Sequence, residues 1–350
     1  MKLKRLAVLT LLLTVLLSAV SCGRGGEPRT NTYYEYFDTV SYISSYRGSV
    51  ESKGEFADTC ARIEEIMKKY HRLMDIYHEY DGMNNLATVN ENAGIAPVTV
   101  SEELIELILY AKEIYVLTGG EVNVAMGSVL SLWHECREEA EADKGAARIP
   151  HEAALRAAAE HTSIDSIVID RSASTVYISD KDTSIDLGAI GKGYTAERAA
   201  EYLEEEGIDS YVLNFGGNIR AVGTKPDGEA WVTGITNPDV LSAQAYAARI
   251  SLSDSSCVTS GSYQRYFTVD GKDYHHIIDK DTLYPSEYFV SVSVITPDSA
   301  LADALSTALF SMSYEDGLAL CDSIGGVGVI WIRTDGEILM SEAINAILIK

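Results

Sequence analysis

The sequence predicts an α+β fold: one large domain of mixed antiparallel sheets and packed helices. Apolar residues recur with helical spacing through much of the first half of the 350-residue chain, whereas short strand-like runs dominate the second half. The strand and helix runs do not alternate regularly, which argues against a parallel βαβ fold. No later change in composition requires a second domain, so we expect a single one.

The first half begins with a tyrosine-rich, strand-like run over 33–46. Helical spacing of apolar residues follows over 54–76 and again over 100–117, where Gly119 and Gly120 end the helix. Two further helices are predicted over 126–142 and 150–161.

The second half mixes strands with two well-defined helices. We expect one helix over 194–206, ended by Gly207, and another over 299–312, entered through the capping residues 296–299. A hairpin is predicted over 266–278, because Asp270-Gly271 favours a tight turn. The remaining predicted elements are a hairpin over 166–179, strands over 211–215, 219–222, 231–235, 247–252 and 288–295, and a short helix before a last hairpin that turns at Asp335-Gly336.

The N-terminus predicts export. In residues 1–21 a basic start precedes a short apolar run and small residues, which is typical of a signal peptide. Cys22 follows directly and indicates a lipoprotein signal, in which Cys22 is acylated; an ordinary cleaved signal with an incidental Cys is the alternative. We expect a lipidated tether over 22–31 and the folded domain over 32–350. The protein would then be anchored to the cell membrane, facing the extracytoplasmic side.

The net charge of −24 narrows the range of functions. An exported protein this acidic is a poor candidate for binding nucleic acid, so we expect no nucleic-acid partner. It would also repel a bare phosphate ligand, so any phosphate chemistry requires a metal or locally placed cations. The four Cys residues after Cys22 are widely spaced and contain no CxxC pair, which argues against zinc and favours buried free thiols.

A glycine cluster over 186–194, DLGAIGKGY, precedes the predicted helix 194–206. Three Gly residues within six positions let the backbone approach a ligand closely, and Lys192 stands where a cation meets a phosphate at a helix N-terminus. A plain glycine-rich turn with a solvated Lys is the alternative. A second pair, Gly216-Gly217 in 214–218, indicates a bulge or close backbone packing.

Two polar segments follow. The run 259–265, TSGSYQR, contains a Ser that resembles a nucleophile but lacks the G-x-S-x-G pattern of a nucleophile elbow. His275 and His276 are adjacent on a predicted strand and therefore point to opposite faces, so at most one of them faces a given site. A strand His of this kind is more often a surface or packed residue than a catalytic one.

Asp303 and Thr307 are four residues apart in the apolar helix 299–312 and share one face. A carboxylate in such a setting requires a partner or a metal, because burying it alone costs several kcal/mol. A carboxylate and a hydroxyl are oxygen ligands suited to Mg²⁺, which keeps waters and binds substrate phosphates. An Asp that caps a neighbouring loop is the alternative.

Taken together, these segments resemble the ApbE family, the FAD:protein FMN transferases, over roughly residues 35–335. The family pattern reads D-hydrophobic-G-A-[IL]-[AG]-K-G-[YF], then N-x-G-G-N, T-S-G-x-Y-x-R, H-x-I-D and A-D-A-x-[ST]-T. All five motifs occur here in that order. Two segments depart from it: the usual H-I-I-D-P-x-T-G reads HIIDKDTL, and Asn123 stands where Asp is commoner.

The resemblance implies Mg²⁺ as cofactor and FAD as substrate, cleaved so that FMN is joined to a Thr or Ser of another protein and AMP leaves. It implies acceptors among the flavoprotein subunits of membrane redox complexes or among extracellular reductases. An FAD pyrophosphatase and a non-catalytic FAD-binding lipoprotein are the alternatives. The site residues it implies are Ala189 (through its carbonyl), Asp303 and Thr307 for the metal, Phe37, Tyr77, Glu121, Val122, Asn123, Asp186, Lys192 and Ile277 for FAD, and His276, Asp279 and Lys192 for catalysis.

Overall fold

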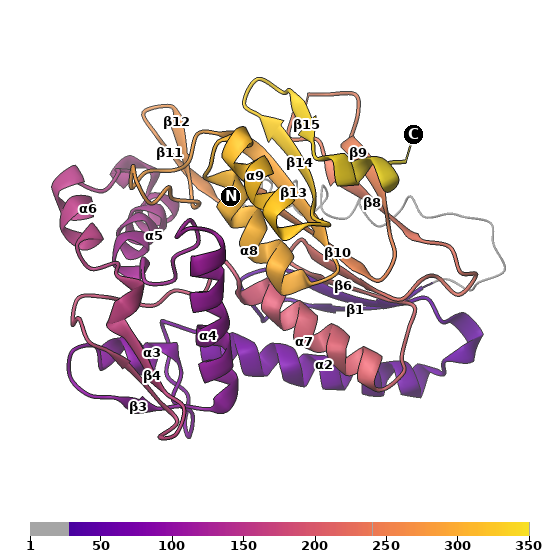
Figure 1. Cartoon of the computed structure of the whole chain (residues 1–350), viewed down its shortest axis with the longest axis horizontal. Helices are drawn as coiled ribbons and strands as arrows, with labels where there is room; N and C mark the ends of the chain where they lie inside the picture. Colours follow the sequence, from indigo (N-terminus) through magenta and orange to yellow (C-terminus); the bar gives the residue numbers. More distant parts are fainter. Residues whose placement is uncertain (1–27, 240, 350) are drawn as a thin grey trace.

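A computed structural model describes residues 28–239 and 241–349, which form an α+β domain around one large sheet (Figure 1). The sheet has eight strands, each antiparallel to its neighbours. Its strand order is β1 (Arg29–Tyr33), β2 (Ser41–Ser45), β6 (Tyr211–Phe215), β7 (Asn218–Val222), β10 (Ser255–Gly261), β13 (Phe289–Thr296), β14 (Gly328–Arg333) and β15 (Ile338–Met340). The predicted signal peptide and Cys22 lie outside the described residues.

Four helices cover one face of this sheet. They are α2 (Lys53–Met74), α7 (Gly191–Glu205), α8 (Ser299–Phe310) and α9 (Tyr314–Ile324). Apolar residues of α2 and α7 pack on β2 and β6, for example Met67 and Leu203 on Phe215. Leu305 and Leu309 of α8 pack with the inward side chains of β10, β13 and β14. Figure 1 shows α7 and α8 next to each other across the middle of the molecule.

The opposite face of the sheet is covered only in part. The hairpin of β8 (Trp231–Thr236) and β9 (Tyr246–Leu252) packs there against Ala221, Cys257 and Ile295. The first strands of the sheet on this side, β2 and β6, contribute Tyr42 and Asn214 to a cleft instead.

A mostly helical part, residues 76–190, lies beside the sheet (Figure 1). Its core, which includes Leu104 and Ile108, is completed by Ala300, Ala304 and Ala308 of α8. Its elements are α3 (Leu86–Glu91), β3 (Val98–Thr99), α4 (Glu102–Leu117), α5 (Gly127–Ala142), α6 (Glu152–Ala159), β4 (Ile167–Asp170) and β5 (Thr175–Ile178). The hairpin of β11 (Tyr266–Val269) and β12 (Lys272–His275) packs on α5 through Phe267.

Local sequence explains where α8 begins. Asp298 is its N-cap, and the side-chain Oδ1 accepts the backbone N–H groups of Ala300 at 2.7 Å and of Leu301 at 3.1 Å. The capping predicted for 296–299 is therefore confirmed. The polar face of α8, which carries Asp303 and Thr307, lies toward the cleft.

Two predicted boundaries were wrong, and some elements, β10 and α3 among them, were not predicted. β1 begins at Arg29 and pairs with β2, so residues 29–31 are strand rather than tether. Helix α7 begins at Gly191, inside the glycine cluster, three residues before the predicted start. Strand β10 was not predicted, because its small polar residues resemble a loop; it is nevertheless a central strand that lies under α8.

The cysteines agree with the prediction. Cys60, Cys136, Cys257 and Cys321 are all buried free thiols. In the described part of the chain, no helix combines the length and the apolar character needed to cross a membrane.

Candidate functional site

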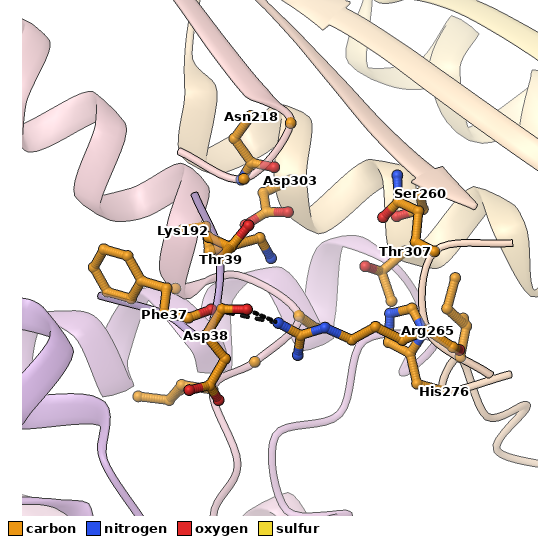
Figure 2. A pocket seen from close by; sticks show the side chains of 18 of the residues that line it. Phe37, Asp38, Thr39, Lys192, Asn218, Ser260, Arg265, His276, Asp303 and Thr307 are labelled. Carbon is orange, nitrogen blue, oxygen red and sulfur yellow. Dashed lines mark hydrogen bonds between the residues drawn. The ribbon is translucent and has the colours of Figure 1, made fainter. Parts of the chain in front are cut away.

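A cleft of about 2300 Å³ opens between the sheet and the helical part. Most pockets for small molecules measure roughly 300–1,000 Å³, so this cleft has room for a dinucleotide and for part of a second molecule. Its walls come from the β1–β2 loop, the ends of β6 and β7, the glycine cluster, α5, α8 and the segment after β10. Figure 2 shows side chains from these segments converging on the cleft.

The glycine cluster forms the turn that leads into α7. Asp186 Oδ1 accepts the backbone N–H of Gly188 at 2.7 Å, and the backbone N–H of Asp186 is itself bonded to Val124 at 2.8 Å. Helix α7 has no side-chain cap, and the backbone N–H of Gly191 bonds to the Leu187 carbonyl at 2.9 Å. Among the described residues the backbone N–H of Lys192 has no backbone partner, so it is open to a ligand at the helix N-terminus. Lys192 lies in that first turn and lines the cleft.

The structure brings Asp303 against this turn. Asp303 Oδ2 accepts the backbone N–H of Gly193 at 2.7 Å, and the side chain is only 4% exposed. A Cβ at Gly193 would overlap Asp303 Cβ and the carbonyl oxygen of Ser299, so only Gly permits the two helices to approach this closely. The predicted proximity of the helical carboxylate and the glycine turn is therefore confirmed.

This bond also leaves a backbone acceptor open. In a regular helix the N–H of Gly193 would bond to the carbonyl of Ala189, four residues earlier. Because that N–H goes to Asp303, the Ala189 carbonyl receives no backbone hydrogen bond from the described residues. Ala189, Asp303 and Thr307 all line the cleft and offer a carbonyl, a carboxylate and a hydroxyl, an oxygen set that suits a hard divalent cation.

Asn218 lies beside the same carboxylate (Figure 2). It is 2% exposed, and its amide favours the charged form of Asp303. Its Nδ2 nevertheless makes no hydrogen bond of good geometry with any acceptor among the described residues. A buried, unsatisfied donor at a cleft wall is rare in folded proteins and indicates a place where a ligand binds.

Burial controls the charges at the site. It raises the pKa of Asp303 and of Asp186 above the ordinary range of a carboxyl, because the charged form loses water. The Lys192 ammonium acts against the shift at both carboxyls. The site therefore contains two carboxylates but only one nearby Lys to balance their charge. This excess of negative charge favours the binding of a cation.

The end of β10 forms a link to α8, and the segment that follows it contributes one further cation to the cleft. Ser306 donates to the backbone carbonyl of Asp303 at 2.9 Å, so Ser260 donates to Ser306 Oγ at 2.8 Å. The Ser of the TSG motif thus links β10 to α8 and is not a free nucleophile. Arg265 extends across the cleft, where its Nη2 donates to the carbonyls of Asp38 at 3.0 Å and of Phe37 at 3.4 Å (Figure 2).

Both adjacent histidines line the cleft, whereas at most one was expected to face a given site, but their contacts differ. His275 packs edge-on against Phe310 and its Nε2 bonds to the carbonyl of Ser286 at 2.9 Å. His276 Nδ1 lies 3.2 Å from the carbonyl of Arg265; because a carbonyl only accepts, Nδ1 carries the proton and Nε2 keeps a lone pair. Figure 2 shows the His276 ring on the same side of the cleft as Thr307.

Aromatic residues occupy the outer parts of the cleft. Tyr77 is 59% exposed and stacks on His134, with ring centroids 5.1 Å apart. Phe37 has a left-handed backbone, with φ of 58°, and its ring lies between His71 and Phe215. Ile277 also lines the cleft, although it is mostly buried in the core beneath.

Of four other predicted residues, two do not line the cleft and two line it but are bonded to other protein groups. Asp279 does not line the cleft: its Oδ1 accepts the backbone N–H groups of residues 281 and 282, so it stabilises its own turn. Val122 is buried in the helical core and does not line the cleft either. Glu121 and Asn123 do line it, but Glu121 pairs with Lys280 at 3.3 Å and the Asn123 amide bonds to the backbone.

Three of the cleft residues described above were not among the predicted site residues. Asn218 and Arg265 lie in the motifs 214–218 and 259–265, so their signal was present in the sequence but was not assigned a role. His134 lies in α5, and no local pattern around it indicates a site.

Comparison with known proteins agrees with this geometry. The ApbE family model matches residues 37–331. An FAD:protein FMN transferase of Treponema pallidum (strain Nichols) is 32% identical over 347 residues, 95% of this chain and 92% of that protein. An FAD:protein FMN transferase of Klebsiella pneumoniae (strain 342) is 30% identical over 282 residues, 80% of this chain and 84% of that protein.

A solved structure gives the same result for the fold. The crystal structure of the ApbE protein from Thermotoga maritima superposes with a TM-score of 0.80 and 26% identity, over 93% of this chain and 100% of that one. The family match spans every segment that forms the cleft from Phe37 to Thr307. The chain therefore belongs to the ApbE family.

Proposed function

We propose that this protein is an FAD:protein FMN transferase, which cleaves FAD at its diphosphate and joins the FMN half to a Thr or Ser of another protein. The observation that carries the proposal is the contact of Asp303 with the N-terminus of α7, beside Lys192, at the wall of a large cleft. The relatives named above bear this activity in their names, and the chain covers most of their length.

We propose Mg²⁺ as the cofactor, held by the Ala189 carbonyl, the Asp303 carboxylate and the Thr307 hydroxyl. The donor chemistry fits, because Mg²⁺ prefers oxygen ligands and the carbonyl of Ala189 is free of backbone hydrogen bonds from the described residues. When bound, the ion supplies positive charge for the FAD diphosphate. Its presence would also offset the burial of Asp303.

The protein's own residues would hold and orient the reactants. The side chain and the backbone N–H of Lys192 in the first turn of α7 would bind diphosphate oxygens. Tyr77 and Phe37 offer aromatic surface to the rings of FAD. In the transfer, the acceptor hydroxyl oxygen bonds to the FMN phosphorus, the bond from that phosphorus to AMP breaks, and His276 Nε2 takes the hydroxyl proton.

The acceptor requires its own space in the cleft. Beyond Asn214 the cleft continues along Tyr42 and Tyr46 to Trp231 and Arg249 of the β8–β9 hairpin. We propose that the acceptor segment approaches along this side. We also propose that the acceptors are flavoprotein subunits of membrane redox complexes or extracellular reductases, and that lipidated Cys22 holds the enzyme at the membrane on the extracytoplasmic side.

The activity can be tested directly. With FAD, Mg²⁺ and an acceptor subunit, we expect mass spectrometry to find FMN added to an acceptor Thr or Ser, with one AMP released per FMN attached. A chelator should stop both products. AMP and free FMN formed without any acceptor would instead identify an FAD pyrophosphatase, and FAD bound without any AMP would identify a binding protein.

His276 gives a prediction for pH. His276 is exposed at the cleft surface, but the protein atoms packed around its ring displace bulk water and, with the charges of Arg265 and Lys192, lower its pKa to about 3. An ordinary His would become protonated below about pH 6.5 and lose its lone pair. We therefore expect the transfer rate to stay constant from about pH 8 to about pH 6.

The matching variant is His276→Gln. It should lower the rate about 100-fold or more at every pH, which is the usual contribution of a general base, while FAD still binds. A wild-type rate that falls with an apparent pKa of about 6.5, and loses that dependence in the variant, would contradict the lowered pKa.

A further inference from the structure

Helices α7 and α8 are joined by a reciprocal pair of hydrogen bonds. The backbone N–H of Gly193 on α7 donates to Asp303 on α8 at 2.7 Å. The backbone N–H of Ser299 on α8 donates to Glu197 Oε2 on α7 at 2.6 Å. Each helix thus begins against a carboxylate of the other helix, and the two bonds are one helical turn apart on both. A slide or tilt of α8 against α7 would break both bonds.

Glu197 is itself held by a buried cation. Arg220 of β7 contacts it with Nε at 3.2 Å and Nη2 at 3.5 Å, and the two residues are 4% and 8% exposed respectively. Burial raises the pKa of Glu197, and the Arg220 charge acts against that shift. Neither side chain lines the cleft. Glu197 and Arg220 can therefore affect the chemistry only through other residues.

Arg220 has two further acidic partners on its outer side. Its Nη2 donates to Glu204 at 2.7 Å and its Nη1 to Asp254 at 3.1 Å, and these carboxylates are 45% and 59% exposed. A buried ion pair contributes little net stability over an apolar pair, because removing both charges from water is costly. Only Glu197 among these partners reaches α8, through the N–H of Ser299. This contact distinguishes Glu197 from the other two.

We infer that Glu197, oriented by Arg220, is a positioning residue: by holding the first turn of α8 it sets Asp303 and Thr307 relative to the Ala189 carbonyl. The inference rests on the proposed function, because these three residues form the proposed Mg²⁺ site. Ser299 precedes Asp303 by one turn of a well-capped helix, so displacement of the first turn displaces the carboxylate with it. Residues that orient metal ligands in this way typically change metal affinity about 10–100-fold when mutated.

The test compares Glu197→Gln with Glu204→Gln. Both variants remove one carboxylate from Arg220, but only the first weakens the acceptor of the Ser299 N–H. We expect Glu197→Gln to raise the Mg²⁺ concentration for half-maximal FAD binding about 10-fold or more, read from flavin fluorescence, with kcat largely recovered at saturating Mg²⁺. Glu204→Gln should stay close to wild type.

A second variant tests the same hydrogen bond from the α8 side. Ser299→Pro removes the N–H that Glu197 accepts, and Pro is tolerated at the first position of a helix when the residue before it is extended, as residue 298 is. Because the ring also replaces a fully buried hydroxyl, the melting temperature of this variant is measured beside its Mg²⁺ midpoint. It should raise the Mg²⁺ midpoint in the same direction, and the double variant Glu197→Gln/Ser299→Pro should add little more.

Two outcomes would overturn the inference: an unchanged Mg²⁺ midpoint in Glu197→Gln, or an equal shift in Glu204→Gln. Calorimetry of Mg²⁺ binding to the FAD-loaded protein gives the same comparison without any activity. If wild type binds FAD with Mg²⁺ but transfers no FMN, the proposed activity fails while the positioning role is still tested, because these titrations report binding.

Discussion

Replacing Asp303 with Asn is expected to lower the rate of FMN transfer at least about 100-fold, because the variant lacks the carboxylate proposed to bind Mg²⁺ and hence several kcal/mol of charge stabilisation. The amide oxygen can still accept the Gly193 N–H, so the helix contact should remain. The measurement is AMP release and FMN transfer at saturating FAD over a range of Mg²⁺ concentrations. Near-normal turnover in this variant would contradict the proposed site.

The same substitution should stabilise the metal-free protein. Burial raises the pKa of Asp303 in the folded state, so the folded state binds more protons than the unfolded state between the two pKa values. The free energy of unfolding therefore falls as the pH rises through this interval. Above the interval, the buried charged carboxylate continues to destabilise the folded state. The Asn side chain carries no charge, so the variant should melt at a higher temperature than metal-free wild type at pH 7 and show a weaker pH dependence.

Two controls accompany Asp303→Asn. Mg²⁺ with FAD should raise the melting temperature of wild type more than that of the variant, because only wild type retains the full ligand set. Asp298→Asn changes an acidic residue on the same helix but keeps a good N-cap, and it should leave activity nearly unchanged. Equal loss of activity in both variants would indicate a general effect of charge on α8.

Replacing Gly193 with Ala should damage both the fold and the site. The added Cβ would overlap the Ser299 carbonyl and Asp303 Cβ, and a backbone oxygen cannot rotate away as a flexible side chain can. Helices α7 and α8 would have to separate, and such overpacking costs about 1–3 kcal/mol or more. The separation would also break the Gly193–Asp303 hydrogen bond. We expect a lower melting temperature and loss of Mg²⁺-dependent FAD binding.

Gly54→Ala is the matched control. Gly54 also lies in the first turn of a helix, α2, but its only neighbour within 4 Å is Ser52 Oγ at 3.8 Å. Ala is the better helix former by roughly 1 kcal/mol, so this variant should be as stable as wild type or more stable, with normal activity. If Gly193→Ala were equally harmless, the close approach of α7 and α8 would not be needed for function.

The elements predicted best were those with a strong local pattern. Helix α2 follows from its apolar spacing, to which the structure adds a capping box at Ser52 and Glu55, and the β11–β12 turn follows from Asp270-Gly271. Strand β10 was missed because Ser255, Ser256 and Thr259 carry no strand pattern of their own. Its conformation is set by pairing with β7 and β13 on either side, which is a non-local effect.

The site shows the same division. Asp303 and Thr307 were predicted to share a face from their spacing alone, and the structure places both at the cleft. The resemblance also implied Asp279 and Val122 as site residues, but neither lines the cleft, because Asp279 satisfies its own turn and Val122 completes a core. A motif identifies the segments near a site. It does not show which side chains face the site and which ones instead bond to the backbone of their own turn.

By itself the sequence determined the periodic elements and the cap of α8, because each of these depends on residues within a turn or two of one another, and the net charge and the order of the motifs are read from it directly. Only the tertiary structure decided that Gly193 meets Asp303, 110 residues further along the chain, and that Glu197 reaches Ser299. These contacts form when α7 and α8 bury their apolar faces on one sheet. That packing depends on the whole chain, so no local pattern specifies it.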